Sequence, residues 1–318
     1  MNAPEQASGG TPPAPPVVAF GETLVDQFKD REVLGGAPFN VTCHLGALGA
    51  RPVLVTRTGK DTAGEMLQRA MSARRLDVRG IQIDPVRPTG RVRVIEDGGG
   101  HRFDILPEQA YDHIHPGLAR MVGLSVHPAM VYFGTLSQRS EESRRALRDL
   151  LGAVSACAFL DINLRDPWVD AEAVLWSLGR ASVVKLNAEE LERVSALARL
   201  DGTTPEARAA VLLSTFDLDR VVVTCGAGGA WTLDRAGRLD TVAGQSLSRL
   251  VDTVGAGDGF AAVVMLGLLH GWPPAETLAR ANDFAGAVCQ IRGAVPEAGD
   301  FYAPFVRAWQ LDREAMRA

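Results

Sequence analysis

The stretch VDTVGAGDGFAA (251–262) places small residues and a carboxylate where an apolar run begins. The apolar run is typical of a buried helix that ends near Gly271. Residues 255–257 would then form the helix N-terminus, where unpaired amides and the helix dipole favour an anion. Asp258 could take a proton from a hydroxyl while those amides hold the developing charge, as phosphoryl transfer to an alcohol requires. Taken alone, the stretch is more typical of a tight turn followed by a helix-start aspartate.

The sequence lacks the other common nucleotide and metal signatures. No G-x-x-x-x-G-K-[ST] segment is present, no G-x-G-x-x-G follows the first predicted strand, and the protein-kinase motifs are missing. The six histidines show no zinc-hydrolase spacing. A formal charge of −5 with mixed signs argues against a nucleic-acid partner. The scattered cysteines are expected to be buried thiols in a reducing cytoplasm, at Cys43, Cys157, Cys225 and Cys289.

Length and composition indicate a globular α/β protein. With 318 residues, of which 46% are hydrophobic, the chain suits one large domain or two ordinary ones. Residues 1–16, rich in Pro, Gly and Ala, are predicted to form a disordered tail ahead of a domain at 17–318. The tail has neither the basic nor the apolar character of a targeting peptide, and no apolar run is long enough to span a membrane. We therefore expect a cytoplasmic protein.

Short runs rich in β-branched residues alternate with helical patterns from Val17 onward. Because these runs are apolar on both faces, they are typical of parallel strands buried between helices. Helical patterns such as 140–154 and 204–216 separate them. The alternation predicts an open, doubly wound α/β sheet. The predicted strands are 17–22, 51–59, 131–136, 158–164, 182–187 and 220–226.

Two segments, 21–36 and 89–107, interrupt this alternation and have the pattern of hairpins. The second alternates polar and apolar residues around a turn at Gly98-Gly99-Gly100. The segments at about 21–36 and 86–108 are predicted to form a small separate sheet that covers a site as a lid. The alternative is an ordinary β-meander at the edge of the main sheet. Exposed hairpin edges are prone to pairing, so a homodimer through the lid is one expected arrangement.

Several blocks of the chain resemble the PfkB, or ribokinase-like, carbohydrate kinases. DTVGAGDGFAA is similar to the C-terminal signature of that family, and GGAPFNVTCHLGALGA (35–50) to its first signature. The resemblance covers roughly Val17 to the C-terminus, and GGAPFNV, DINLR and KLNAEEL look most like the fructokinase branch. Further matching blocks, in the family's order, are RTGKDTAGEML (57–67), DINLRDPW (161–168), KLNAEEL (185–191) and VVTCGAGGAW (222–231).

The resemblance implies a three-layer α/β/α fold with a small β-sheet lid, ATP as phosphoryl donor, Mg²⁺, and a sugar hydroxyl as acceptor. Asp258 resembles the catalytic base, and Arg165 resembles a residue that neutralises the transferring phosphoryl group. The residues that resemble the anion hole are Gly255, Ala256 and Gly257. Those that resemble the sugar ligands are Asp26, Gly36 and Asn40.

The same resemblance implies a nucleotide and metal side. Asn187 and Glu190 resemble an N-x-x-E pair near Mg²⁺ and the phosphates, with Glu190 acting through water. From the residues alone, this pair fits equally a helix cap and a first-turn acid. Thr224, Gly226 and Gly229 resemble nucleotide-binding residues at a strand end, and Asn282 resembles one beside the adenine. Asp252, with the backbone near Val254, Ile291 and Gly293, resembles a monovalent-cation (K⁺) site of some relatives.

The expected function is an ATP-dependent sugar kinase acting on a primary hydroxyl, with fructose to fructose 6-phosphate as the leading reaction. The alternatives are 2-keto-3-deoxygluconate, ribose or a nucleoside as acceptor, and a catalytically silent sugar- or nucleotide-binding protein on the same fold. The chain departs from many relatives at Gly228, where they carry a long or charged side chain, and at Val254 and Gly259.

Overall fold

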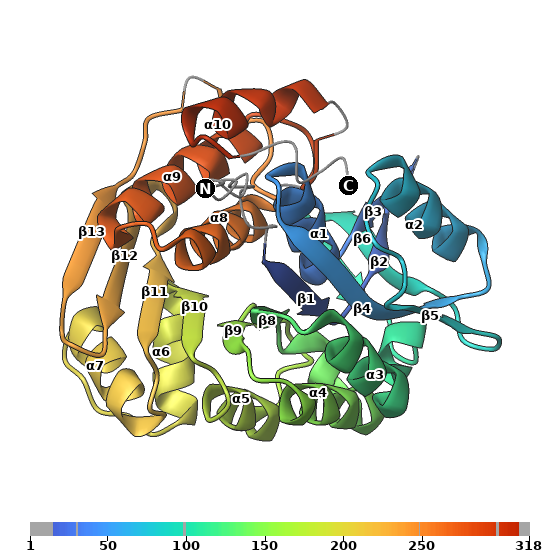
Figure 1. Cartoon of the computed structure of the whole chain (residues 1–318), viewed down its shortest axis with the longest axis horizontal. Helices are drawn as coiled ribbons and strands as arrows, with labels where there is room; N and C mark the ends of the chain where they lie inside the picture. The colour runs from blue at the N-terminus through green and yellow to red at the C-terminus, as the bar shows by residue number, and fades with distance from the viewer. Residues whose placement is uncertain (1–14, 30, 98–99, 248, 297–298, 312–318) are drawn as a thin grey trace, which may run out of the picture.

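The computed structural model describes residues 15–29, 31–97, 100–247, 249–296 and 299–311. Among these residues, nine strands form one sheet in the order β13-β12-β11-β10-β9-β8-β1-β4-β5 (Figure 1). The strands from β11 to β5 in this order pair in parallel, and β12 and β13 add antiparallel at one edge. The bounds are β1 (Pro16–Phe20), β4 (Arg51–Gly59), β5 (Ile81–Asp84), β8 (Met130–Phe133), β9 (Cys157–Asp161), β10 (Val183–Asn187), β11 (Arg220–Thr224), β12 (Gly229–Asp234) and β13 (Leu239–Ala243).

All six predicted parallel strands are confirmed, although four of them end earlier than the apolar pattern does. The chain leaves the sheet at Phe20, Phe133, Asp161 and Thr224, and the next residues form loops at the carboxyl edge. At the other end, β1 begins at Pro16, one residue inside the predicted tail, and residues 1–14 lie outside the described part. Strand order reverses between β1 and β8, which is where open α/β sheets bind ligands.

Helices cover both faces of this sheet, and the pleat divides the core between them. Val17 and Ala19 pack with α1, α2, α8, α9 and α10, whereas Val18 and Phe20 pack with the helices from α3 to α7. A strand buried on both faces has no polar side to show, which explains its unbroken apolar sequence. The helices are α1 (Ala37–Ala47), α2 (Thr62–Ala73), α3 (Pro116–Val126), α4 (Glu141–Ala153), α5 (Ala171–Leu178), α6 (Ala188–Leu197), α7 (Pro205–Thr215), α8 (Ala256–His270), α9 (Pro274–Val288) and α10 (Ala303–Ala308).

The two predicted hairpins form a separate sheet of four strands, in the order β3-β2-β6-β7, and do not extend the main sheet. Its strands are β2 (Leu24–Gln27), β3 (Glu32–Gly35), β6 (Gly90–Asp97) and β7 (Gly100–Ile105). Gly98 and Gly99 of the predicted turn lie outside the described residues, and Gly100 begins β7. We call this the second sheet; its action as a lid stays a prediction.

The second sheet is held to the main body by a small apolar cluster. Leu24, Val92 and Ile105 of the sheet pack with Leu136, and Trp168 of the main body packs against them. Leu136 belongs to a short 3₁₀ helix, η2 (Leu136–Arg139), which follows β8. We call this cluster the root of the second sheet.

None of the described helices combines the length and the apolar character that a membrane span needs.

Candidate active site

The N-terminus of α8 has the geometry that the sequence predicts. Gly255 precedes the helix with a φ of 80°, in the left-handed region that favours glycine. A Cβ at this position would lie 2.4 Å from the Cα of Ala294, so the residue must also be small. Asp258 lies in the first turn, and α8 ends before Gly271 as expected. The early amides of α8 and the carboxylate of Asp258 therefore share one end of a buried helix.

A side chain from α1 holds the carboxylate of Asp258. The Nδ2 of Asn40 donates a hydrogen bond of 2.7 Å to Oδ2 of Asp258, across 218 residues of sequence. Burial raises the pKa of Asp258 above its usual value, while the bond from Asn40 and the charges of Lys185 and Arg165 act in the opposite direction. A raised pKa makes the carboxylate a better proton acceptor, which suits a general base.

A buried ion pair lies beside the N-terminus of α8. The Nζ of Lys185, on β10, lies 3.0 and 3.1 Å from the two carboxylate oxygens of Asp161, on β9. A Cβ on Gly257 would lie 3.2 Å from the same Nζ, so the ammonium packs against the helix start. Burial would lower the pKa of Lys185, but the charges of Asp161, Glu190 and Asp258 raise it. A permanent positive charge therefore lies next to the proposed anion hole.

The predicted sugar ligands lie where the second sheet meets the main body. Asp26 is on β2, and burial raises its pKa to about 6, with Arg165 acting to lower it. Gly36 precedes α1 with a φ of 103°, and a Cβ there would lie 2.6 Å from the carbonyl oxygen of Glu22. Asn40, only 4% exposed, is one turn into α1. The structure thus brings Gly36 and Asn40 to the start of one helix and Asn40 into contact with Asp258.

Arg165 is exposed and lies in the loop between β9 and α5. Its charge lowers the pKa of Glu22, Asp26 and Asp258, so all three carboxyl groups lie within its electrostatic reach. The backbone of the loop is a tight turn, since the amide of Trp168 donates to the carbonyl of Arg165 over 2.7 Å. This position suits a cation that reaches toward transferring phosphate.

Asn187 and Glu190 form a reciprocal cap at the start of α6. Oδ1 of Asn187 accepts from the amide of Glu190 at 2.8 Å, and Oε2 of Glu190 accepts from the amide of Asn187 at 2.9 Å. Oε1 of Glu190 also accepts from the amide of Leu164, at 2.8 Å. The capping interpretation of this pair is thereby confirmed; a contact with phosphates or Mg²⁺ stays a prediction.

The predicted nucleotide residues gather at the carboxyl ends of β10 and β11. Asn187 and Thr224 are direct neighbours in the parallel register. After Thr224, the chain turns through Gly226, at φ 54°, and Gly229, at φ 96°. A Cβ on Gly229 would lie 2.1 Å from the carbonyl oxygen of Val242, so only glycine fits between β11 and β13. Asn282, on α9, donates from Nδ2 to the carbonyl of Ala243 over 3.3 Å, which places it beside this edge.

Glu190 and Asp252 are the two residues predicted to take part in cation binding. In the described part of the chain, no group of three or more His, Cys, Asp or Glu residues could hold a metal ion by itself. Both oxygens of Glu190 accept backbone amides, which fits a contact through water better than a bare ligand. Asp252 joins two loops, since its oxygens accept from the amides of Val254 at 3.0 Å and Gly293 at 3.1 Å.

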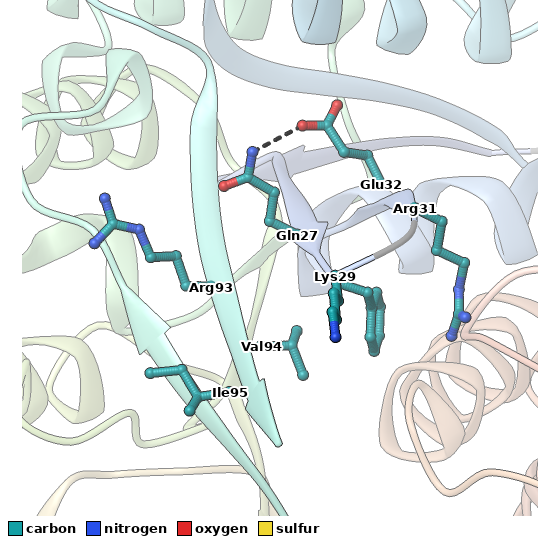
Figure 2. A pocket seen from close by; sticks show the side chains of 8 residues that line it. Gln27, Lys29, Arg31, Glu32, Arg93, Val94 and Ile95 are labelled. Carbon is teal, nitrogen blue, oxygen red and sulfur yellow. Dashed lines mark hydrogen bonds between the residues drawn. The ribbon is translucent and has the colours of Figure 1, made fainter. Parts of the chain in front are cut away.

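A cavity of about 530 Å³ lies against the second sheet, and its lining includes Gln27, Glu32, Arg93, Val94 and Ile95 (Figure 2). Gln27 and Arg93 are paired across β2 and β6, and Gln27 donates to Glu32 of β3 over 2.9 Å. Side chains alternate along a strand, so the face that carries these residues is not the face that carries Asp26. None of the candidate-site residues named above is among the described residues that line this cavity.

Three buried charged residues of the site carried no individual prediction. Lys185 and Asp161 belong to matching blocks of the sequence, and Glu22 is the last residue of a predicted strand. The available signal was a charged residue in an otherwise apolar strand pattern, as in SVVKLN, AFLDINL and VVAFGE. Such a residue must be paired when buried.

Comparisons with known proteins identify the family and the fold of the chain. The pfkB family carbohydrate kinase pattern matches residues 13–298. A fructokinase of Escherichia coli is 28% identical over 269 residues, covering 79% of this chain and 84% of the relative. The structure of a Vibrio cholerae fructokinase, described with fructose, ADP and calcium bound, superposes with a TM-score of 0.74 at 24% identity, covering 91% and 98% of the two chains. A Xylella fastidiosa fructokinase with bound ATP has a TM-score of 0.80 at 20% identity, covering 93% and 99%. The chain therefore belongs to the pfkB family of carbohydrate kinases.

Proposed function

We propose that this protein transfers the γ-phosphoryl group of ATP to the primary hydroxyl of fructose, yielding fructose 6-phosphate and ADP. The observation that carries the proposal is the start of α8, where Asp258, held by Asn40, lies beside the glycine-rich helix N-terminus. The named fructokinase relatives support fructose as the acceptor.

In this mechanism the acceptor hydroxyl lies between Asp258 and the amides of residues 255–257. Asp258 takes the hydroxyl proton while the sugar oxygen forms a bond to the γ-phosphorus and the bond to the ADP oxygen breaks. The amides, Arg165 and the adjacent ammonium of Lys185 stabilise the negative charge on the transferring group. Asp258 then returns the proton to solvent, so the reaction releases one proton in total.

The nucleotide would lie along the carboxyl ends of β10 and β11, beside Asn187 and Thr224. The nucleotide would be bordered by the loop at Gly226 and Gly229 and by the side chain of Asn282. Mg²⁺, held by the phosphates and by water on Glu190, would neutralise phosphate charge. Asp252 and the backbone of its two loops would hold a monovalent cation. The second sheet would cover the sugar through Asp26, and pairing of two such sheets would give a homodimer.

A coupled assay of ADP release with a panel of acceptors tests the proposal. The panel contains fructose, 2-keto-3-deoxygluconate, ribose and a nucleoside, and ³¹P NMR identifies the phosphorylated position. The expected result is the highest kcat/KM with fructose and phosphate at C6. Preferred turnover of another acceptor would contradict fructose as the substrate but would still support a sugar kinase. Binding of a sugar without turnover of any would contradict catalysis and favour the silent binding protein.

A further inference from the structure

Glu22 directly follows the bend after β1, at the carboxyl edge of the sheet next to the reversal of strand order. Its side chain is buried, with the residue only 4% exposed. Hydrogen bonds with the backbone of Glu22 and Ala37 reach its carboxyl group. Oε2, however, is buried and has no hydrogen-bond partner among the described residues. A buried carboxyl oxygen without a partner is costly, which indicates that a further group completes this site.

Charged and titratable groups from five elements surround Glu22. The charge of Arg165, in the loop after β9, lowers its pKa, and the charge of Asp258, on α8, raises it. The charge of Glu22 in turn raises the pKa of three further groups from elements packed around it. They are Tyr111 of η1 (Ala110–His113), Tyr132 of β8 and Arg139 of η2. Glu22 therefore lies between the proposed base and the root of the second sheet.

Two polar atoms of other residues are buried without a hydrogen-bond partner among the described residues, as Oε2 of Glu22 is. Oγ1 of Thr23 and Oδ1 of Asn40 are buried and have no partner in the described part of the chain. Thr23 is next in sequence, and Asn40 already touches Asp258 through its other amide atom. The unpaired oxygens of Glu22 and Asn40, both close to Asp258, are what a ligand with several hydroxyl groups would satisfy.

The register of the second sheet shows which of its charged side chains lie on the same face as Asp26. Asp26 pairs with Val92, so these two side chains lie on one face, together with Leu24 and Ile105 of the root. Arg91 and Arg93 alternate with Val92 and thus lie on the opposite face. Of the nearby cations, Lys185 is paired with Asp161 and Arg139 is paired with Asp112. Glu22, Asp26 and Asp258 are therefore opposed mainly by Arg165, a balance that disfavours a carboxylate on the acceptor.

We propose that Glu22 is a further acceptor-binding residue, whose Oε2 hydrogen-bonds a hydroxyl of the sugar and whose carboxyl selects neutral sugars over sugar acids. This inference rests on the proposed function. Burial raises the pKa of Glu22 to about 7, so the carboxyl can donate or accept near neutral pH. The hydroxyl partner is one other than the hydroxyl that Asp258 deprotonates.

The test combines Glu22→Gln with acceptors that lack single hydroxyl groups. Glutamine keeps the size of the side chain but removes its charge. Glu206→Gln, at an exposed first-turn position of α7, is the matched control. We expect E22Q to raise the KM for fructose about tenfold, the effect of one charged hydrogen bond, with the KM for ATP unchanged. For the deoxyfructose that lacks the bonded hydroxyl, the KM with wild type should be higher than that for fructose by the same factor. The E22Q substitution should cause no further rise of that KM.

Isothermal calorimetry of sugar binding without nucleotide gives a readout that does not need turnover. Tighter binding of a sugar acid relative to fructose in E22Q than in wild type would support the inference. The inference would be overturned if each deoxyfructose lost the same affinity relative to fructose in both proteins. It would also be overturned if E22Q raised the KM for the sugar and the KM for ATP equally. If wild type turns over no sugar but E22Q weakens sugar binding about tenfold, the proposed function fails and the inference stands. If E22Q binds every sugar as wild type does, the inference fails whatever the enzyme phosphorylates.

Discussion

The two sheets of this protein differ in how their sequence is constrained. Strands of the main sheet are covered on both faces, so that Val17 to Phe20 are completely buried. The second sheet packs against the main body at its root, and farther along its strands Ile95 is 37% exposed and Phe103 47% exposed. The main body can therefore hold side chains in fixed positions for chemistry. Away from its root, the second sheet is less constrained by packing.

This contrast divides the candidate site by role. Asp258, Lys185 and Asp161 come from the main body, and Asp26 comes from the second sheet. Glu22 lies in the connection between the two sheets. We therefore expect changes in the body to affect turnover or stability, changes in the second sheet to affect acceptor binding, and changes in the connection to affect both.

The largest effect is expected for the proposed base in the main body. Asp258→Asn keeps the shape of the side chain and its contact with Asn40 but removes the proton acceptor. We expect kcat to fall by roughly 10²–10⁴-fold with sugar binding nearly unchanged. Steady-state kinetics and calorimetry would measure the two quantities. Asp201→Asn, at an exposed position, is the control and should behave as wild type; near wild-type turnover of D258N would remove Asp258 from the mechanism.

The second effect is a pH dependence of stability that originates at the connection. Glu22 has a pKa of about 7 in the folded protein against 4.5 for an ordinary glutamate, so between these values the folded state holds a proton that the unfolded state has lost. Wild-type stability should therefore fall as pH rises through this window. Glu22→Gln cannot bind this proton, so its free energy of unfolding relative to wild type should increase by roughly 2–3 kcal/mol from pH 5 to pH 8.

Urea unfolding of both proteins at the two pH values measures this difference. Comparing E22Q with wild type at each pH cancels the contributions of Asp26 and Asp161, whose pKa values are also raised to about 6. Parallel pH profiles for the two proteins would show that Glu22 titrates as an exposed glutamate does, and would contradict the raised pKa of its buried carboxyl group.

A smaller effect, confined to acceptor binding, is expected for the second sheet. Asp26→Asn removes a carboxylate that can accept sugar hydroxyls and leaves the main body untouched. We expect the KM for the sugar to rise about tenfold, equivalent to roughly 1.4 kcal/mol, with the KM for ATP unchanged. If D26N lost as much kcat as D258N does, the proposed division of roles between the two sheets would be wrong.

The sequence predicted the main body better than the functional contacts, for physical reasons. Strands buried on both faces carry their own signal, and the glycines before Asp258 mark a helix start that only a few residue types can form. The pairing of Asp258 with Asn40 spans 218 residues and depends on how α1 packs beside α8, which no local pattern encodes. Sequence reasoning therefore found both residues but assigned Asn40 to the sugar alone.

Charged residues in apolar strands show the same limit. Lys185 and Glu22 each lie beside buried residues, and a pattern gives no partner for either. The structure pairs Lys185 with Asp161 of the adjacent strand and leaves one oxygen of Glu22 without a described partner. For Asn187 and Glu190 the sequence left two interpretations open because a helix cap and a phosphate contact need the same residues at the same spacing.

The smallest effect is expected at the root, where the two sheets meet. Nε1 of Trp168 donates to the carbonyl of Ile105 at the end of β7 over 3.2 Å, and its ring lies 4.4 Å from the guanidinium carbon of Arg139. Trp168→Phe keeps an aromatic ring but loses the hydrogen bond, which should cost about 1 kcal/mol of stability. The amide of Trp168 also closes the turn at Arg165, so a shifted ring should change the sugar KM a few-fold. Trp176→Phe, whose ring packs under Arg148 on the covering helices, should cost similar stability without changing the sugar KM. Equal changes of the sugar KM in both variants would mean that the second sheet is coupled to the whole body and not through its root.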